Sequence, residues 1–398
     1  MYILRSYFII LIMNVECSIR AVFKKKSDKK KLLILKFDAL GDYILFRNFL
    51  KPIAESTKYS NYEITLLGNE NLEELSKIID SDALANSIYI NPKDYKNGIL
   101  KTIDLIRKLS NSKYDTIINY HSSRNVLSDI IICSLKAYTK IGFKSNDISN
   151  SRTLIYFKVF CNFFYTKLFK VQQTFCHEFE RNKSFCENLL NNNNLPIAQL
   201  PVIAQKDLKI INNNISPITL GLAENNYLVV AIGAGANARK LSNKKMLGLL
   251  QNISKKYFLP VVFVGTKADV AVANLLISEI HTKIPWINLC GKTNILQIVS
   301  LVANAQAIIC YDSGIYHIAK SLNKPNICIA GGGHFSRFVN YKLPSKNTFF
   351  CYENMLCFDC DWKCIYAKKE NDSYNCLNKI SDDQIKISIN NLFFYLNL

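Results

Sequence analysis

The chain has few acidic residues for its size. Only 31 aspartates and glutamates stand against 50 lysines and arginines among 398 residues, so the formal net charge is +19. An imbalance of this size indicates an acidic partner, such as a phosphorylated substrate, an anionic membrane surface or a nucleic acid. Because lysine and asparagine are frequent throughout, part of the imbalance reflects general composition and carries no functional information.

A long uninterrupted apolar run is also missing. The segment from Tyr2 to Phe23 is interrupted by charged and amide side chains, and its longest clean run, Tyr7–Met13, is far shorter than the ~20 residues that a membrane span requires. No small-residue cleavage site follows, which argues against a signal peptide. Six lysines lie between positions 24 and 31. We therefore expect 1–31 to be an apolar and basic leader that either lies on an anionic bilayer or is simply solvated.

The thirteen cysteines cannot all pair, because their number is odd. Without a secretory context this indicates a reducing compartment. Following Cys351, a cluster with the spacing C-x2-C-x3-C-x11-C is formed by Cys357, Cys360, Cys364 and Cys376. Four thiolates could bind zinc. The alternative, reduced or paired cysteines in a surface loop, stays open.

Helix-like and strand-like runs alternate along most of the chain, a pattern typical of α/β architecture with parallel sheets. Asparagine-rich runs at 191–194 and 212–214 favour a boundary between two halves at about 205–225. We expect an N-terminal Rossmann-like domain over 32–215 and a C-terminal one over 216–380, which carries the cysteine-rich loop 351–376. A C-terminal helix should follow over 381–398. The strands are predicted at 32–37, 62–67, 87–90, 116–120, 140–143, 227–232, 260–264, 286–289, 307–311 and 326–330.

The first predicted strand ends in the turn Asp38-Ala39-Leu40-Gly41-Asp42, and a helix is expected to begin near Tyr43. Asp42 should thus lie at the carboxyl end of a strand, where open α/β sheets bind ligands. A carboxylate there can cap the helix, act as a general base, or do both. His121 and Arg124 follow a later predicted strand and should lie on the same edge.

Aromatic and basic side chains alternate over 151–185. Such a stretch can stack on nucleic acid or contact a lipid surface. A partly buried helix is the favoured interpretation.

In the second half, the strand at 227–232 leads into the turn Gly233-Ala234-Gly235-Ala236-Asn237-Ala238. This turn matches the dinucleotide fingerprint G-x-G-x-x-A, so a nicotinamide-dependent oxidoreductase is one alternative. The next strand, however, ends in Gly265-Thr266-Lys267, without the acidic residue that would hold a ribose. Arg239 and Lys240 directly follow the turn, and two adjacent cations favour a sugar-nucleotide diphosphate instead.

The segment 307–340 carries the most functional information. Its strand ends in Asp312-Ser313-Gly314, and a helix with His317 follows. The start of that helix offers N–H groups and positive dipole to an anion such as a diphosphate. We expect Asp312 and Ser313 to cap the helix and His317 to face the same crevice. The simpler alternative is a capped helix with a satisfied histidine.

Taken together, these motifs resemble glycosyltransferase family 9, the bacterial ADP-heptose:lipopolysaccharide heptosyltransferases. The resemblance rests on LLILKFDALGDYIL, on HEFERN at His177, on the strand with GAGANARKLS and on the segment around Asp312, and it extends from about Leu32 to Asp383. It implies a GT-B fold, in which two Rossmann-like domains face each other across a cleft. It also implies sugar transfer with inversion at the anomeric carbon.

Carried over residue by residue, the resemblance makes Asp42 the catalytic base and Lys36 a neighbouring support. It makes Arg239 or Lys240 the cation that holds the diphosphate. The donor-binding positions it implies are Lys36, Gly235, Arg239, Lys240, Asp312, Ser313, Gly314 and His317. His121 and Arg124 remain acceptor-side candidates. Neither a metal nor a cofactor is expected, and the D-x-D matches at 80–82 and 359–361 are attributed to chance.

The implied donor is a nucleotide-diphosphate sugar, ADP-heptose first of all. The implied acceptor is a lipid-anchored oligosaccharide of the inner leaflet, which predicts a cytoplasmic enzyme peripheral to the membrane and no nucleic-acid partner. The chain departs from the family pattern at Ala231-Ile232, at 239–242 and at 330–334, all on the donor side. A non-catalytic sugar-nucleotide or glycan-binding protein on the same fold is therefore the main alternative.

Overall fold

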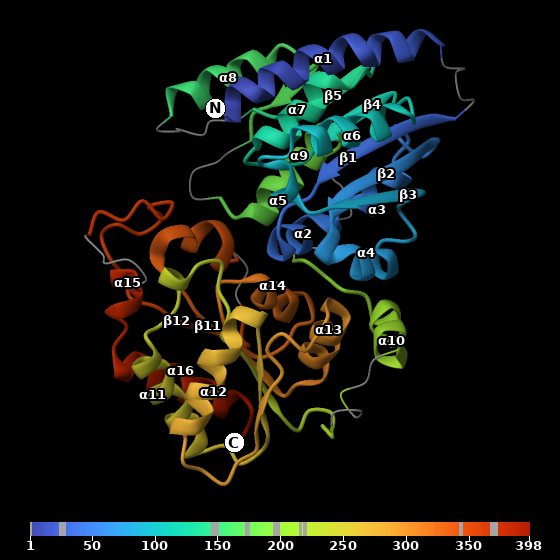
Figure 1. Cartoon of the computed structure of the whole chain (residues 1–398). Coiled ribbons are helices and arrows are strands. Elements are labelled where there is room, and N and C mark those ends of the chain that lie inside the picture. Colours follow the sequence, from blue (N-terminus) through green and yellow to red (C-terminus); the bar gives the residue numbers. More distant parts are fainter. Residues whose placement is uncertain are drawn as a thin grey trace. The chain divides into compact units, whose positions relative to one another are not determined.

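The computed structural model describes residues 2–23, 29–144, 151–171, 176–193, 200–214, 217, 221–341, 345–366 and 373–398. The chain forms two compact units, the first comprising 1–174 and 179–197 and the second 175–178 and 198–398 (Figure 1). Each unit contains one parallel sheet with helices packed on it. The predicted α/β class is confirmed.

The first unit has a sheet in the order β3-β2-β1-β4-β5-β6. Its strands are β1 (Lys30–Lys36), β2 (Tyr62–Asn69), β3 (Asn86–Ile90), β4 (Thr116–Asn119), β5 (Thr139–Phe143) and β6 (Lys167–Phe169). The strand order reverses between β1 and β4, and the register pairs Leu35 with Asn119. The residues that follow these two strands therefore meet at one point on the sheet edge, where α/β folds bind ligands.

Nine helices accompany this sheet in the described part of the unit. They are α1 (Tyr2–Phe23), α2 (Leu40–Arg47), α3 (Leu50–Glu55), α4 (Glu73–Ile79), α5 (Pro92–Tyr95), α6 (Ile99–Ser110), α7 (Val126–Ser134), α8 (Arg152–Asn162) and α9 (Glu178–Leu190), with the 3-10 turn η1 (Glu70–Leu72) before α4. The aromatic-basic stretch is thus a helix, a short strand and another helix rather than one helix.

Helix α1 belongs to the first unit and is not a separate leader. It packs on α6, α7 and α8, and one of its faces is buried in the core through Ile9, Ile10, Met13 and Cys17. By length and composition alone, Tyr2–Arg20 is apolar enough to cross a membrane, which differs from our expectation. A core helix can have the same composition, because both environments remove apolar side chains from water. Positions 24–28 of the lysine cluster lie outside the described residues.

The second unit has a sheet in the order β12-β11-β10-β7-β8-β9. Its strands are β7 (Leu228–Ala231), β8 (Val261–Val264), β9 (Trp286–Asn288), β10 (Ala307–Tyr311), β11 (Asn326–Ile329) and β12 (Thr348–Cys351). Its described helices are α10 (Gln205–Asn214), α11 (Asn243–Ser254), α12 (Val270–Glu279), α13 (Ile295–Asn304), α14 (Gly314–Ser321), α15 (Asn375–Asn378) and α16 (Asp382–Tyr395). Short turns lie at η3 (Asn237–Arg239), η4 (Lys267–Asp269), η5 (Gly332–His334) and the π-helical η6 (Phe335–Val339).

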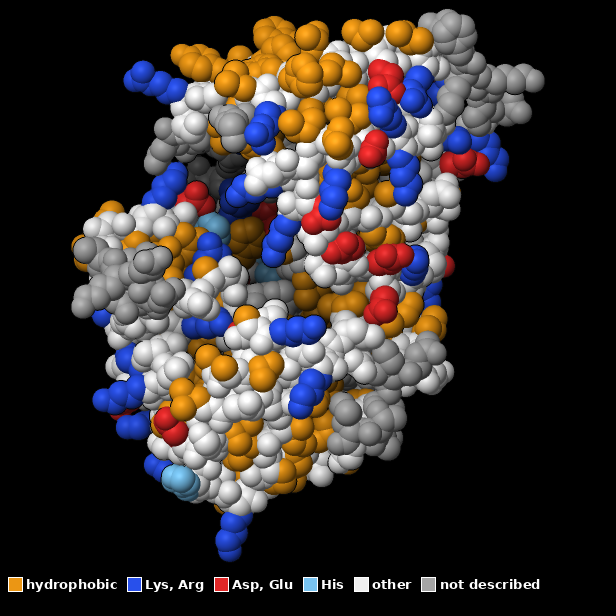
Figure 2. All heavy atoms as spheres, viewed as in Figure 1, with side chains coloured by type: hydrophobic (Ala, Val, Ile, Leu, Met, Phe, Trp, Pro, Cys, Tyr) orange, Lys and Arg blue, Asp and Glu red, His pale blue; other side chains and the backbone are white. Residues whose placement is uncertain are grey.

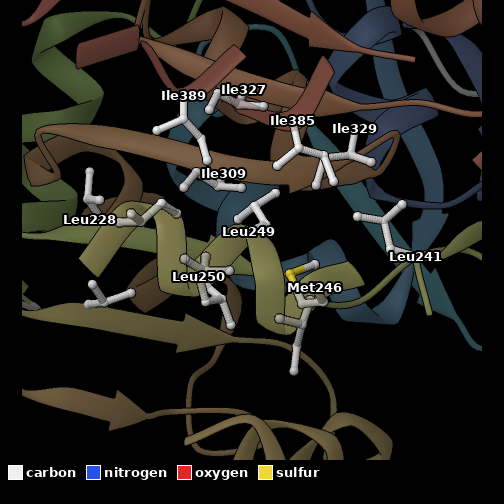
Figure 3. Packing of buried hydrophobic residues seen from close by; sticks show 14 of the residues in the cluster. Leu228, Leu241, Met246, Leu249, Leu250, Ile309, Ile327, Ile329, Ile385 and Ile389 are labelled. Carbon is white, nitrogen blue, oxygen red and sulfur yellow. The ribbon is translucent and has the colours of Figure 1, made fainter. Parts of the chain in front are cut away.

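The core of the second unit explains why its boundaries differ from the predicted ones. Leu249 and Leu250 of α11 are buried in one cluster with Ile309 of β10 and with Ile385 and Ile389 of α16 (Figure 3). Helix α16 is therefore an integral part of this unit. Helix α10 packs on α13 and also belongs to it, so the division falls at 197–198 and not at 215–216.

Candidate active site

At the end of β1 in the first unit, a buried lysine supports the carboxylate of Asp38, a residue to which the sequence assigned no role. Lys36 is 1% exposed, and its Nζ donates to Asp38 Oδ2 at 2.8 Å. His121 Nε2 lies 3.5 Å from Asp38 Oδ1. Lys36 thus pairs with a carboxylate only two residues later in the chain. The pair is visible in the sequence as Lys36-Phe37-Asp38.

Asp42 lies four residues further, in the first turn of α2. The helix begins at Leu40, earlier than predicted, and its N-cap is Ala39, which makes no side-chain capping bond. Asp42 is therefore not the N-cap of this helix, which was one of the two roles considered for it. Asp38 and Asp42 are both partly exposed, so the end of β1 presents two carboxylates.

Both acceptor-side candidates, His121 and Arg124, lie inside the first unit with fully buried side chains. His121 Nδ1 donates to Asn119 Oδ1 at 2.7 Å, and its Nε2 accepts from the Phe37 N–H at 3.3 Å. Burial lowers the pKa of His121 to about 4, so the ring is neutral and links β1 to β4. Arg124 donates to both carboxylate oxygens of Asp129, at 2.9 and 3.1 Å. Both side chains are thus bonded within the protein, and their role on the acceptor side stays a prediction.

In the second unit, the strand-to-helix turn after β10 carries a free hydroxyl. Ser313 is the N-cap of α14 by position, but its side chain makes no capping bond. Among the described residues, its buried Oγ has no hydrogen-bond partner. Burial raises the pKa of the neighbouring Asp312 to about 6, and the charge of Arg239 opposes that shift. The expected side-chain capping is therefore wrong, and the turn keeps its polar groups available beside Gly314.

His317 is buried beneath this turn and does not face a crevice as predicted. It is 2% exposed, and its Nδ1 bonds the Tyr341 hydroxyl at 2.8 Å. Burial, and then the nearby His177, lowers the pKa of His317 to about 3. The ring of His177 lies 4.0 Å from that of Tyr341 between centroids. Both histidines therefore contact Tyr341. This agrees with the simpler alternative, in which His317 is a buried, hydrogen-bonded side chain and not a ligand-binding one.

The structure separates the two cations that the sequence left equivalent. Lys240 Nζ pairs with Asp269 Oδ1 at 2.7 Å, and Asp269 also accepts from the N–H and hydroxyl of Thr266. Burial would raise the pKa of Asp269, but these bonds outweigh it and lower the pKa. Arg239, in contrast, forms no ion pair or hydrogen bond within the described ranges, and its Cζ lies 4.2 Å from the centre of the Trp362 ring. Gly235 is exposed. It lies next to Arg239, because a Cβ added to it would be 3.4 Å from Arg239 Nη1.

The cysteine-rich loop lies against the triple glycine that departs from the family pattern. A Cβ on Gly331 or Gly333 would collide with the Trp362 ring at 2.8 or 2.2 Å, and one on Gly332 would collide with Phe358 at 2.5 Å. The glycines thus make room for this loop. All thirteen cysteines are free, and across the described part of the chain no group of three or more histidines, cysteines or acidic residues is arranged to hold a metal ion.

The two D-x-D matches take part in structural contacts. Asp80 pairs with Arg47 at 2.9 Å and also bonds Tyr43. Asp359 accepts from Ser336, and Asp361 bonds His334 at 2.6 Å.

Comparison with known proteins gives consistent results. The model of the family described as glycosyltransferase family 9 (heptosyltransferase) matches residues 102–359. The lipopolysaccharide core heptosyltransferase OpsX of Haemophilus influenzae is 23% identical over 75% of this chain and 78% of its own. Lipooligosaccharide heptosyltransferase 2 of Haemophilus ducreyi is 38% identical, but the match spans only 21% of this chain and 24% of that protein.

Two solved structures share the fold. A family 9 glycosyl transferase from Veillonella parvula superposes with a TM-score of 0.67 at 18% identity, covering 92% of this chain and 97% of that one. The heptosyltransferase WaaC of E. coli, solved with ADP-2-deoxy-2-fluoro heptose, gives 0.62 at 14% identity, covering 92% and 100%. These likenesses establish the GT-B fold.

Proposed function

Because the chain belongs to glycosyltransferase family 9, we propose that it transfers heptose from ADP-heptose to a lipopolysaccharide core or a related envelope glycan. The name of OpsX supports this acceptor class, and the ligand named with WaaC supports this donor. We propose further that transfer inverts the anomeric carbon and proceeds without a metal ion.

The observation that carries the proposal is the guanidinium of Arg239, which has no ion pair or hydrogen bond among the described residues and stacks on Trp362. The charge of Arg239 opposes the rise that burial causes in the pKa of Asp312, and the Leu241 N–H, two residues after Arg239, donates to the Tyr311 hydroxyl at 3.1 Å. The free Oγ of Ser313 follows Asp312 directly in the chain. The first N–H groups of α14 have no partner within the helix. Arg239, Ser313 and these N–H groups can together stabilise the negative charge that builds up on a departing diphosphate.

In the proposed reaction, an acceptor hydroxyl attacks the anomeric carbon from the face opposite the diphosphate. A carbon–oxygen bond forms to the acceptor, the bond to the diphosphate oxygen breaks, and the hydroxyl proton passes to Asp42 as general base. Asp38, held by Lys36 and close to His121, is the second carboxylate at this strand end and the natural comparison.

The test is transfer by the purified protein from a panel of ADP-, GDP-, UDP- and dTDP-sugars, with and without EDTA. We expect transfer from ADP-heptose, a product of inverted anomeric configuration by NMR, and no effect of EDTA. Asp42→Asn should lower kcat by ~10²–10⁴ with little change in donor affinity, and by more than Asp38→Asn. Donor binding without any transfer or hydrolysis would support the non-catalytic alternative. A thermal shift with NADH but not with ADP would support the oxidoreductase.

We also propose that the protein works on the anionic inner face of the cytoplasmic membrane. Two neighbouring helices of the first unit, α1 and α8, carry an outward-facing group of large apolar side chains, visible together in Figure 2. The exposed members are Leu4, Phe8, Leu11, Ile12, Val15, Ile19, Ile155, Tyr156, Val159 and Phe163. An exposed apolar group of this extent marks an interaction surface.

The charge of the two helices favours an anionic bilayer as the occupant of this surface. Arg5, Arg20, Arg152 and Lys158 stand against the single acid Glu16, a net of 4 − 1 = +3. Tyr7 of α1 contacts Phe157 and Phe160 of α8 edge-on, at 5.4 and 5.0 Å between centroids, which joins the two helices beneath the surface. Apolar side chains with basic neighbours suit a helix pair lying in the headgroup region.

Point variants test this better than truncation, because removing α1 would uncover the core. Leu11→Gln with Phe163→Gln should reduce binding to phosphatidylglycerol vesicles several-fold, while Leu275→Gln, an exposed position in the other unit, should not. Salt at 1 M, where screening acts beyond ~3 Å, should release the wild type. Unchanged binding of the double variant would refute the proposal. A wild-type dimer and a monomeric variant in vesicle-free solution would instead assign the surface to a second copy.

A further inference from the structure

Trp362, in the cysteine-rich loop, is the side chain in contact with the unpaired guanidinium. Arg239 Cζ lies 4.2 Å from the centre of its ring. A carboxylate in this position would neutralise the cation and occupy its N–H groups. An aromatic face does neither, because a guanidinium stacked on a ring keeps its donors directed outward in its own plane.

The loop backbone is built to hold this ring in place. The N–H of Asp361 donates to Gly333 O at 2.9 Å, and the Asp361 carboxylate bonds His334 Nε2 at 2.6 Å. Trp362 itself has φ +58°, a left-handed conformation that is unusual for a bulky residue and persists only where its surroundings fix it. Gly331 and Gly333 leave the space that the indole fills.

The same loop is also tied to the turn that carries the arginine. The Tyr374 N–H donates to Ala238 O at 2.8 Å, one residue before Arg239, and the Tyr374 ring lies 5.0 Å from that of Trp362. Within the part of the chain that the structure describes, the buried Nε1–H of Trp362 has no acceptor. One edge of the indole is therefore a donor that the protein leaves unused.

We propose that Trp362 is a positioning residue of the donor site, which orients Arg239 toward the diphosphate of the bound nucleotide sugar. This inference rests on the proposed function. It explains why the cysteine-rich loop accompanies the glycines at 331–333: the chain departs from the family pattern there in order to place an aromatic platform under the cation. Diphosphate binding therefore depends on this loop, whichever sugar is transferred.

The experiment compares Trp362→Leu, which removes the ring, with Trp362→Phe, which keeps an aromatic face but lacks the N–H. Calorimetry with ADP and with inorganic pyrophosphate gives the dissociation constants, and donor kinetics give KM and kcat. We expect Trp362→Leu to weaken ADP and pyrophosphate about 10-fold, which is within the range of a partly buried cation–π contact. It should lower kcat/KM for the donor at least as much, because a displaced Arg239 also stabilises the departing diphosphate less. Trp362→Phe should restore most of the affinity. Phe358→Leu, a neighbouring loop aromatic that packs on Gly332, is the matched control and should leave the dissociation constants unchanged.

A second comparison shows whether Trp362 acts through the arginine. In an Arg239→Met background, Trp362→Leu should weaken ADP by less than 2-fold, because the cation it positions is gone. Equal losses in both backgrounds, or wild-type affinity in Trp362→Leu with unchanged melting temperature, would refute the proposed role. If the wild type bound neither ADP nor pyrophosphate, both this inference and the proposed function would be wrong; if it bound both and Trp362 had no effect, only this inference would be.

Discussion

Replacing Arg124 by methionine decides between a structural and an acceptor-binding role for this residue. Its guanidinium reaches Asp129 through two bonds of 2.9 and 3.1 Å, and both side chains are fully buried. Arg124 Nη1 also donates to Asn162 at 2.7 Å, and its Cζ lies 4.5 Å above the ring of Tyr165. Methionine fills part of the volume but provides no charge and no donor.

The expected loss of stability in Arg124→Met comes from the carboxylate of Asp129, which stays buried without its cation. Without Arg124, the carboxylate of Asp129 remains in the core, and among the described residues only the Tyr165 hydroxyl, 2.7 Å away, still donates to it. Breaking a buried ion pair on one side costs about 3–5 kcal/mol, a large part of the about 5–15 kcal/mol that stabilises a typical domain. For a unit of this size the melting temperature should fall by about 6–20 °C.

The assay is calorimetric and urea unfolding of the wild type, Arg124→Met and the double variant Arg124→Met with Asp129→Leu. The double variant should recover much of the loss, because no charge is left unpaired in the core. Lys108→Met, an exposed position in α6, is the control and should change stability by less than about 0.5 kcal/mol. If Arg124→Met lost less than about 1 kcal/mol while the KM for the acceptor rose, the structural assignment would be wrong and Arg124 would be an acceptor residue.

Three further predictions concern other buried groups. Because burial lowers the pKa of His121 from 6.5 to about 4, the unfolded chain takes up a proton below pH 6.5 that the folded chain does not accept until about pH 4. The free energy of unfolding should therefore fall by about 3 kcal/mol as the pH drops across this window, and urea titrations of His121→Asn should show a flatter slope. Leu250→Ala should cost about 2–5 kcal/mol and the exposed Leu275→Ala far less; equal losses would contradict the core assignment. Lys240→Met should destabilise the second unit by leaving a buried carboxylate unpaired, yet weaken ADP less than Arg239→Met does, and the reverse ranking would make Lys240 the diphosphate ligand.

The class of fold and most of the strands could be predicted from the amino-acid sequence alone. The strand predicted at 307–311 is β10, and the one predicted at 260–264 is β8 to within a residue. These strands are buried on both faces, so they appear in the sequence as short continuous apolar runs. The family resemblance was accessible for the same reason, because its motifs are short segments at the ends of such strands.

The elements that the sequence did not predict correctly are two short strands and the first helix. The strands β6 and β12, of three and four residues, were missed. Strand β6 lies inside the stretch 151–185, where the alternation of aromatic and basic side chains favoured a helix. The apolar segment at the start of the chain was assigned to a leader, although α1 buries Met13 and Cys17 in the core. A helix with apolar residues on two faces looks alike in sequence whether protein, lipid or both cover it.

Which polar side chains have partners within the protein became known from the three-dimensional structure alone. Arg239 and Lys240 are adjacent in the sequence, yet Lys240 pairs with Asp269, 29 residues away, and Arg239 stacks on Trp362, far later in the chain. His121, Arg124 and His317 follow or lie close to strand ends as a ligand site requires, but each is buried among partners that the sequence does not place beside it. Local patterns of apolar residues specify strands and helices, because burial repeats along the chain. The partner of a charge depends on which distant segments the fold brings together, and this part of the site could therefore be read only from the structure.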